Sequence, residues 1–338
     1  MPKSGSKIRV PRELWADYVK DVQHRWGAIA TNRIRELNKR LADGKLRTTI
    51  HSAADDVTES RGFALYYSVQ GKGKGVQVLH LAPGFKTLSD LTGFIDQMDR
   101  EKGGRVFSIE GFFGEFGDRT ANRGLSAAGF IPIERVRLWI NPQHLRCVVP
   151  NPRGRYLLRV INPHDRSELV RLFVGAYHGH VDSLFAMPRK EKVAASEFID
   201  YMFSTSKEGR LLRSASFILK DPAGRKLVGA VFVREASGFA YVADLMVDPR
   251  HQRRGIGTFL LVRALEELRR KRHRYVEIMT TLQNPTRSPQ LYWRLGFRPV
   301  RGTSNKRIRL WVRSSEMVRT GIRFREPAPS ERRRFLVR

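Results

Sequence analysis

The stretch DLMVDPRHQRRGIGTFLLVRALEELRRK, residues 244–271, joins an apolar run to a long apolar-striped helix through a proline, three arginines and two glycines. The N-terminus of a helix presents unpaired backbone N–H groups and a partial positive charge. Gly255 and Gly257 let the backbone approach an anion without a Cβ in the way. Arg253 and Arg254 can neutralise phosphates beside them. The stretch therefore predicts a pyrophosphate-binding turn between a strand and a helix.

Two commoner phosphate-binding turns do not fit this segment. No Gly-Lys-Ser/Thr occurs here, which excludes a P-loop, and Leu260 stands where a dinucleotide-binding fingerprint has its third glycine. A turn that only packs a strand against a helix is the alternative interpretation.

The second half of the chain alternates strands and helices around this segment. Apolar residues at spacings of three and four mark the helices, and β-rich runs mark the strands. The expected strands are 155–161, the two arms of a hairpin within 214–235, 239–247, 275–282 and 306–312, and the expected helices are 165–177, 191–203, 256–272 and 288–295.

The first half repeats this order of elements. Its expected strands are 7–10, 46–52, 62–69, 76–84, 105–111 and 134–140, and its expected helices are 11–26, 32–44, 87–103 and 121–130. Two pairs of similar segments lie at nearly one offset, because Pro83 and Pro249 are 166 residues apart and Gly129 and Gly296 are 167 apart. The chain is therefore interpreted as a tandem repeat with a seam at 141–155, which is rich in Pro, Asn and Gly.

The motif VDPRHQRRGIG resembles the acetyl-coenzyme A loop of the GNAT superfamily of N-acetyltransferases, whose pattern is Gln/Arg-x-x-Gly-x-Gly/Ala. SPQLYWRLGF, residues 288–297, resembles the family's second motif, a helix with Tyr four residues before Gly-Phe. The resemblance covers about 155–313 strongly and 7–140 weakly. It implies an α+β fold, an α/β sandwich of two GNAT-like domains, each with a mixed, splayed β-sheet flanked by helices.

The expected domains follow from the repeat and from this resemblance. They are a degenerate, non-catalytic GNAT-like domain at 1–142, a linker at 143–154, a GNAT acetyltransferase domain at 155–313 and a basic C-terminal tail at 314–338. The first repeat lacks the coenzyme loop, and Leu125 stands where the second has Tyr292. We expect the first repeat to keep the fold without the chemistry.

The resemblance also implies roles for individual residues. Tyr292 matches the usual general acid, and a tyrosine packed on the sheet is the alternative. Asp244 is the candidate base on the strand before the loop, with a structural hydrogen-bonding role as the alternative, and Glu277 is a further candidate base. The expected coenzyme-binding residues are Met246, Val247, Gln252, Arg253, Arg254, Gly255, Ile256, Gly257, Thr258, Asn284 and Ser288.

Backbone N–H groups near Met246 and Val247 would polarise the thioester carbonyl. Asn284 lies eight residues before Tyr292 rather than the family's seven, so Ser288 or Arg287 could replace it. His178 and His180 could act in proton transfer, or could be loop histidines without a special task; no metal site is expected.

The charge is the unusual feature of the composition, because 63 Lys and Arg stand against 33 Asp and Glu and give +30. Such an excess suggests a polyanionic partner, RNA or the ribosome before DNA, or else generally solvated basic faces. The glycine-rich segment QGKGKG, residues 70–75, could touch phosphates or form a flexible turn. The arginine-rich residues 319–338 could remain disordered until they meet RNA, or lie along a partner or across the seam.

The sequence thus predicts an N-acetyltransferase that uses acetyl-CoA as co-substrate and transfers directly to an amine. The acceptor is expected on a macromolecule, a protein or a ribosome-associated or RNA-linked amine. The alternative is an RNA- or ribosome-binding protein of GNAT fold in which transfer is secondary or lost. With no apolar signal core, no membrane span and one cysteine, Cys147, a cytoplasmic location is expected, and the oligomeric state stays open.

Overall fold

The computed structural model describes most of the chain. The described residues are 10–26, 28–52, 60–69, 73–82, 84–85, 87–101, 104–110, 123–145, 152, 156–186, 191–206, 209–221, 223, 226–236, 238–300 and 308–335. Cys147, residues 7–9 of the predicted strand at 7–10 and most of the predicted linker lie outside them. Among the described helices, none has both the length and the apolar character that crossing a membrane requires.

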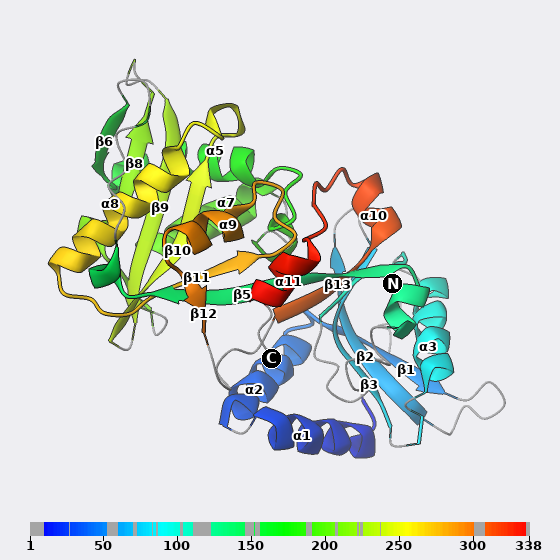
Figure 1. Ribbon diagram of the computed structural model, residues 1–338. Coiled ribbons are helices and arrows are strands. Elements are labelled where there is room, and N and C mark those ends of the chain that lie inside the picture. Colours follow the sequence, from blue (N-terminus) through cyan, green and yellow to red (C-terminus); the bar gives the residue numbers. More distant parts are fainter. Residues whose placement is uncertain are drawn as a thin grey trace, which may run out of the picture. The chain divides into compact units, whose positions relative to one another are not determined.

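The chain divides into two compact units. Figure 1 shows the chain coloured by residue number, from blue at the N-terminus to red at the C-terminus. Unit 1 comprises Met1–Ile133 and Arg309–Gly321, and unit 2 comprises Glu134–Ile308 and Ile322–Arg338. Each unit is thus assembled from two separate segments of the sequence.

Unit 2 contains a mixed sheet in the order β6-β8-β9-β10-β11-β5. All neighbouring pairs are antiparallel except β10 and β11, which run parallel. Its elements are β5 (Phe130–Ile140, from Glu134 onward), β6 (Leu157–Val160), α5 (Arg166–Tyr177), α6 (Ser183–Ala186), α7 (Glu191–Phe203), β7 (Arg210–Leu211), β8 (Phe217–Lys220), β9 (Leu227–Ala236), β10 (Phe239–Val247), α8 (Ile256–Arg270), β11 (Val276–Thr281), α9 (Ser288–Arg294), β12 (Arg298–Pro299) and α11 (Pro329–Phe335).

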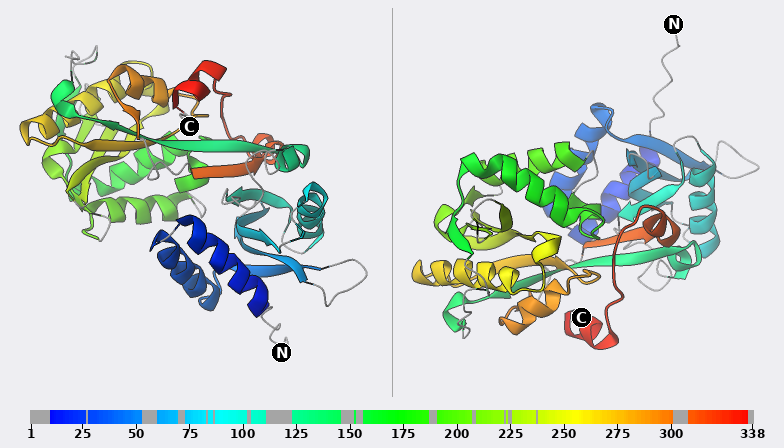
Figure 2. Two further views of the ribbon diagram at one scale, coloured as in Figure 1. Left: turned by 60° about the horizontal axis from the view of Figure 1, so that its bottom comes forward. Right: turned by 90° about the horizontal axis from the view of Figure 1, so that it is seen from above.

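Helices cover both faces of this sheet. Because side chains alternate along a strand, Leu219 and Val231 pack into the core beneath α8. Their neighbours Ile218 and Phe232 pack into a second core with α5 and α7. Figure 2 shows α5 and α7 in green on one side of the strands and α8 in yellow on the other. The predicted mixed, helix-flanked α+β fold is confirmed.

Unit 1 repeats the element order of unit 2. Its sheet runs β1-β2-β3-β4-β13, again with one parallel pair, β3 and β4, which corresponds to β10 and β11. Its elements are α1 (Arg12–Trp26), α2 (Ala28–Ala42), β1 (Arg47–Ser52), β2 (Ser60–Val69), β3 (Gly73–Leu81), α3 (Leu88–Arg100), β4 (Val106–Glu110), β13 (Ile308–Arg313) and α10 (Ser314–Arg319).

The two units exchange the strand that follows the parallel pair. In unit 2, β5 from the first repeat pairs with β11 from Arg135 to Ile140. In unit 1, β13 from the second repeat pairs with β4, and Trp311, 2% exposed, fills its core. The unit boundaries therefore differ from the predicted segments 1–142 and 155–313, because strand pairing crosses the repeats and sequence order does not reveal it.

Lys74 is the described lysine of the glycine-rich segment QGKGKG. Its side chain is fully buried, and its ammonium donates hydrogen bonds to the backbone carbonyls of Met98 and Glu101 at the C-terminal end of α3. A cation in this position stabilises the helix end. Lys74 is therefore a structural residue and is not available to bind phosphate.

Candidate active site

The strands β10 and β11 separate halfway along their length. They pair only from Ala240 to Val242 on β10, although β10 continues to Val247. The register of β10 against β9 shifts between Val242 and Asp244, which marks a β-bulge at Ala243. A bulge bends its strand and re-aims the following side chain. The sheet is thus splayed as predicted, and the separation begins at the bulge, well before Pro249.

The N-terminus of α8 is uncapped by any side chain. Its N-cap is Gly255, which has φ 83° and therefore lies in the left-handed region that favours glycine. A Cβ at Gly255 would meet no atom within 4 Å, so the space beside the helix start is clear. Arg253 and Arg254 are exposed beside it, and Arg253 adopts φ 65°. These residues fit the diphosphate of acetyl-CoA.

The corresponding helix of unit 1 has a closed N-terminus. The hydroxyl oxygen of Thr87 accepts from the backbone N–H of Asp90 at 3.2 Å, and the Asp90 carboxylate accepts from the backbone N–H of Thr87 at 3.2 Å. This capping box occupies amides that are open in α8. Leu125, where the second repeat has Tyr292, is fully buried. Among its described residues, the first repeat therefore has no open helix start that could bind an anion at the position that corresponds to α8, and no proton donor at the position that corresponds to Tyr292.

A cavity of about 650 Å³ lies over the gap between β10 and β11. Twelve of the fourteen predicted site residues line it, whereas Arg254 and Glu277 do not. The lining residues from the prediction are Tyr292, Asp244, Met246, Val247, Gln252, Arg253, Gly255, Ile256, Gly257, Thr258, Asn284 and Ser288. The Glu277 carboxylate instead accepts from the hydroxyl of Tyr275 at 2.8 Å.

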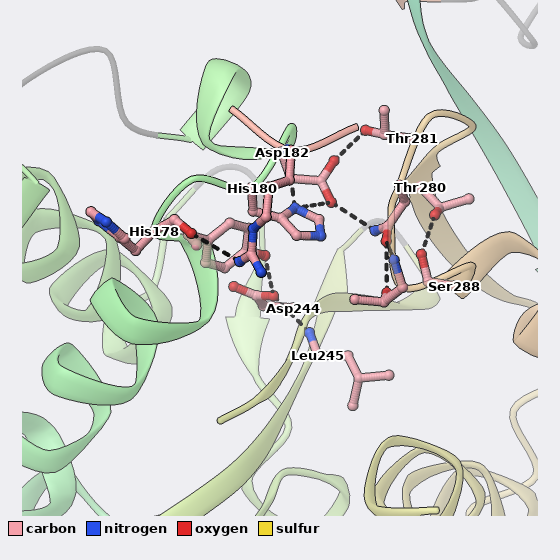
Figure 3. Close-up of polar contacts among 12 residues, drawn as sticks. His178, His180, Asp182, Asp244, Leu245, Thr280, Thr281 and Ser288 are labelled. Atoms are coloured by element: carbon pink, nitrogen blue, oxygen red, sulfur yellow. Dashed lines mark hydrogen bonds and ion pairs between the residues drawn. The ribbon is translucent and has the colours of Figure 1, made fainter. Parts of the chain in front are cut away.

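Asp244 is a buried carboxylate at the bulge, with 7% of the residue exposed. Its Oδ1 accepts from the Tyr177 hydroxyl and from the Leu245 backbone N–H, both at 2.7 Å, while Oδ2 has no hydrogen-bond partner. Burial raises the pKa of Asp244 to about 7, against these two hydrogen bonds, with Asp182 raising and Arg135 lowering the pKa to a smaller extent. Figure 3 shows the carboxylate beside the gap. Asp244 can therefore take up a proton near neutral pH.

Tyr292 has a buried side chain on α9, 6% exposed. Burial raises its pKa well above the usual value, and the nearby carboxylates of Asp182 and Asp244 raise it further. The phenol is therefore protonated at neutral pH and can act as a donor.

The backbone amides of β10 alternate in direction beyond the bulge. The Leu245 N–H meets the Asp244 carboxylate on the side of the gap, and the Val247 carbonyl accepts from the Gln252 side chain at 3.2 Å. Because the backbone groups of successive residues point to opposite sides, those of Val247 face the gap and those of Met246 face β9.

Asn284 uses its side chain to organise the protein itself. Its amide nitrogen donates to Asp182 at 3.0 Å, and its oxygen accepts from the backbone N–H of Thr286 at 2.8 Å and from the Thr286 hydroxyl at 2.6 Å. Ser288, the predicted substitute, is 3.0 Å from the hydroxyl of Thr280. Both line the cavity, but the polar groups of Asn284 are already engaged in this conformation.

The loop after α5 contributes one histidine and one carboxylate to the cavity. His180 is buried, whereas His178 is exposed and points away from the cluster (Figure 3). Asp182, absent from the predicted set, accepts from Asn284 and from the hydroxyl of Thr281. Asp182 lies in the segment YHGHVDS, residues 177–183, whose sequence alone gives no reason to place this carboxylate beside β11.

The C-terminal strap, residues 322–335, crosses the loops that frame the cavity. The Arg323 backbone N–H donates to Gly179 at 2.6 Å, and the Arg325 backbone N–H donates to Gln283 at 3.0 Å. These bonds tie the loop after α5 and the loop after β11 to one segment. The predicted tail at 314–338 is therefore divided, because residues 314–321 belong to unit 1 and the strap belongs to unit 2.

Glu331 anchors this strap. Its carboxylate accepts two hydrogen bonds from Arg325, at 2.6 and 3.0 Å, and further bonds from the Ala328 backbone N–H at 2.9 Å and the Gln290 amide. Phe335 is 1% exposed and packs edge-on against Trp293 of α9. The strap thus fixes the helix that carries Tyr292.

Residues 213–299 match the family model described as "Acetyltransferase (GNAT) domain". No curated protein matches the sequence of this chain. Among solved structures, the chain is similar to a GCN5-related N-acetyltransferase from Sphaerobacter thermophilus, with 17% identity, a TM-score of 0.48 and coverage of 81% of this chain and 84% of that one.

Two further solved structures are similar over most of the chain. A tandem GNAT protein from the clavulanic acid biosynthesis pathway has 16% identity and a TM-score of 0.44, with 79% of this chain and 82% of that one covered. A GCN5-related N-acetyltransferase from Kribbella flavida has 16% identity and a TM-score of 0.44, with 88% and 68% covered. Identities this low carry no information on the acceptor. From the family match, with the splayed strands and the open helix start, residues 213–299 form a GNAT acetyltransferase domain, a family that uses acetyl-CoA as co-substrate.

Proposed function

We propose that the chain transfers an acetyl group from acetyl-CoA directly to an amine. The observation that carries this proposal is the meeting of two features in one cavity. One is a helix start left open by Gly255, and the other is the buried carboxylate of Asp244, whose Oδ2 has no hydrogen-bond partner. The first fits a diphosphate and the second fits a base.

The roles of the residues follow from the balance of the reaction. The amine nitrogen forms a bond to the thioester carbonyl carbon, and its proton passes to Asp244. The Val247 N–H, which faces the gap, polarises the carbonyl oxygen. The carbon–sulfur bond then breaks, and Tyr292 donates its proton to the departing sulfur. No covalent bond to the protein is needed.

The coenzyme-binding residues divide by the part of acetyl-CoA that each would meet. The open amides at the start of α8, from Gly255 to Thr258, would bind the diphosphate, with Arg253 and Arg254 beside it. Val247 and Ser288 line the cavity nearer the gap, where the thioester arm would run. Gln252 supports this arrangement by binding the Val247 carbonyl.

The test is release of the coenzyme A thiol from acetyl-CoA in the presence of amines. Asp244→Asn and Tyr292→Phe should each lower kcat by about 10²–10⁴-fold, the range for loss of a general base or acid. Glu277→Gln is the matched control, because its carboxylate is bound to Tyr275 and does not line the cavity. Equal loss in Asp244→Asn and Glu277→Gln would overturn the assignment of the base.

The net charge of +30 supports an acceptor on a macromolecule, as well as the alternative function of RNA or ribosome binding. In both cases the chain should associate with RNA, and the association should weaken steeply as salt rises from about 50 to 200 mM. Binding of RNA by a protein that neither binds nor turns over acetyl-CoA would favour the alternative. Failure to bind RNA at low salt would remove the support for a nucleic-acid partner.

A further inference from the structure

Asp182 is held at the edge of the cavity by contacts that use only part of its hydrogen-bonding capacity. It accepts from Thr281 and from Asn284, and its side chain remains 20% exposed. An ionised carboxylate offers about four lone-pair sites. The side chain of Asp182 is therefore fixed in place and can still accept further hydrogen bonds from the cavity.

Neither Asp182 nor Asp244 has a lysine or arginine within ion-pairing distance among the described residues. Asp182 is 3.4 Å from the Nδ1 atom of His180, but that atom accepts the backbone N–H of Asp182 at 3.2 Å and so carries no proton. Buried or half-buried charges are normally paired in proteins. Arg135, Arg253, Arg287 and Arg294 also line the cavity, but none of them is ion-paired with Asp182 or Asp244.

Other charged groups near the two carboxylates shift the pKa values of the cavity residues. Arg135 of β5 lines the same cavity and lowers the pKa of Asp244, while Arg323 of the strap is exposed and lowers the pKa of His180. Burial is the main cause of the lowered pKa of His180, whereas the charge of Asp182 and a hydrogen bond with Asn284 raise that pKa. Asp182 and Asp244 are thus the carboxylates that line the cavity, and in the described part of the chain neither has a protein cation bound to it.

We infer that Asp182 binds a cationic group of the acceptor, so that the acceptor carries a second positive charge beside the amine that is acetylated. This inference rests on the proposed function. Asp244, with its partnerless Oδ2, receives the reacting amine, and Asp182, on the opposite loop, receives the second cation (Figure 3). An acceptor with a carboxylate or phosphate at that place would be repelled by Asp182.

Asp182 and Asp244 are opposite in charge to the net charge of the whole chain. Salt screens charges beyond about 10 Å, so the excess of +30 acts on a docking partner, while the two carboxylates act on the group inside the cavity. A basic peptide terminus, a lysine flanked by basic residues, a diamine or an amino sugar with several amines shares the required chemistry. The excess of surface arginine therefore does not exclude a cationic acceptor.

The inference can be tested by measuring the binding of three small amines that have the same number of carbon atoms. Cadaverine, n-pentylamine and 5-aminopentanoate present an ammonium, a methyl group and a carboxylate at the far end. Each is titrated calorimetrically at pH 8 into the full chain saturated with coenzyme A. Cadaverine should bind at least tenfold more tightly than pentylamine, and 5-aminopentanoate should bind most weakly.

Variants assign this preference to Asp182. Asp182→Asn should weaken cadaverine at least tenfold and leave pentylamine within about threefold, whereas Asp182→Glu should keep the preference. Asp200→Asn is the control, because it removes the same charge from an exposed pair with Arg166. Equal affinity of the three amines, no binding of cadaverine, or equal loss of cadaverine and pentylamine in Asp182→Asn would each overturn the inference.

The same titration separates this inference from the proposed function. Failure of coenzyme A itself to bind would refute the proposed function. Binding of coenzyme A without a preference for cadaverine would refute only the role of Asp182.

Discussion

Asp244 sets the pH range of the proposed transfer, because only its ionised form can accept a proton. Its pKa of about 7 predicts that kcat rises with pH below about 7 and levels off above it. A pH profile of kcat with a saturating acceptor would check this. Asp244→Asn should remove the rising limb as well as the activity. A wild-type profile flat from pH 5.5 to 8.5 would contradict a titrating base.

The same carboxylate should destabilise the fold as pH rises. A carboxyl group whose pKa is raised in the folded state costs no stability below its unfolded pKa of 3.8, because it is then protonated in both states. The cost grows as pH rises and is complete above about 7. Asp244→Asn should therefore stabilise the protein relative to wild type by about 2–3 kcal/mol more at pH 8 than at pH 5. Urea unfolding at both pH values measures the difference, and parallel behaviour of the two proteins would contradict it.

Gly257 allows a sharp test of the proposed diphosphate site at the start of α8. A Cβ at this position would make only ordinary contacts, the nearest 3.6 Å from Val247, so Gly257→Ala should fold normally. Gly257→Glu should fold too, since an acidic residue suits the first helical turn, but its carboxylate would occupy the anion site. Saturating acetyl-CoA, at about 100 times Kd, should raise the Tm of Gly257→Ala by about 4 °C. The Tm of Gly257→Glu should not change, and an equal shift in both would place the coenzyme elsewhere.

Residues close together in sequence were the predictable part of the site. The glycines and arginines of the proposed diphosphate site lie in one strand-to-helix turn, so the pattern VDPRHQRRGIG was enough to predict that they lie together. Tyr177 at the end of α5 and Asp182 in the loop after it lie 60 to 70 positions before Asp244, and Arg135 comes from the other repeat. Their part in the cavity depends on tertiary packing that no local pattern specifies.

At the scale of elements, the C-terminal strap should contribute strongly to stability through Glu331. Burial alone would raise the pKa of Glu331, but the hydrogen bonds from Arg325 and from the Ala328 N–H, together with the charges of Arg325 and Arg287, lower the pKa overall. Its contribution is therefore present above pH 4.5 and lost as pH falls through the lowered value. At pH 7, Glu331→Gln should cost about 3 kcal/mol, since it leaves a largely buried arginine without its ionic partner.

Glu326→Gln is the matched control for the strap. Glu326 pairs with Arg332 at 3.1 Å, but its side chain is 66% exposed, so its loss should cost less than about 1 kcal/mol. Equal costs for the two variants in urea unfolding would contradict the anchoring role of Glu331.

The bounds of elements followed closely from sequence periodicity, whereas strand partners did not. The predicted helix 191–203 and strand 239–247 have these bounds in the structure, because apolar spacing and turn residues are local signals. The strand predicted at 306–312 forms as β13, Ile308–Arg313, but pairs in unit 1. Each of β5 and β13 has the same pattern RLW, so the sequence gives no basis for deciding which unit each joins.

At the scale of the whole molecule, strand exchange predicts that the repeats cannot fold apart. A fragment 155–338 would lack β5, leaving β11 with an unpaired edge and removing Val136, Leu138 and Ile140 from the core of unit 2. Such a fragment should be insoluble or unfolded by circular dichroism. Coexpression with a fragment 1–145 should restore a soluble pair, because each piece then supplies the missing strand. A soluble, folded 155–338 fragment alone would contradict this expectation.

The exchange of β5 and β13 also bears on how the first half came to be retained. A duplicated copy that has lost its binding turn would ordinarily be free to drift or disappear. Here its final strand completes the sheet that carries the candidate site, so selection for the proposed transfer would extend to residues with no part in that chemistry. The two repeats would therefore have to be kept together, and replacement of the first repeat by an unrelated domain would require a new strand to pair with β11.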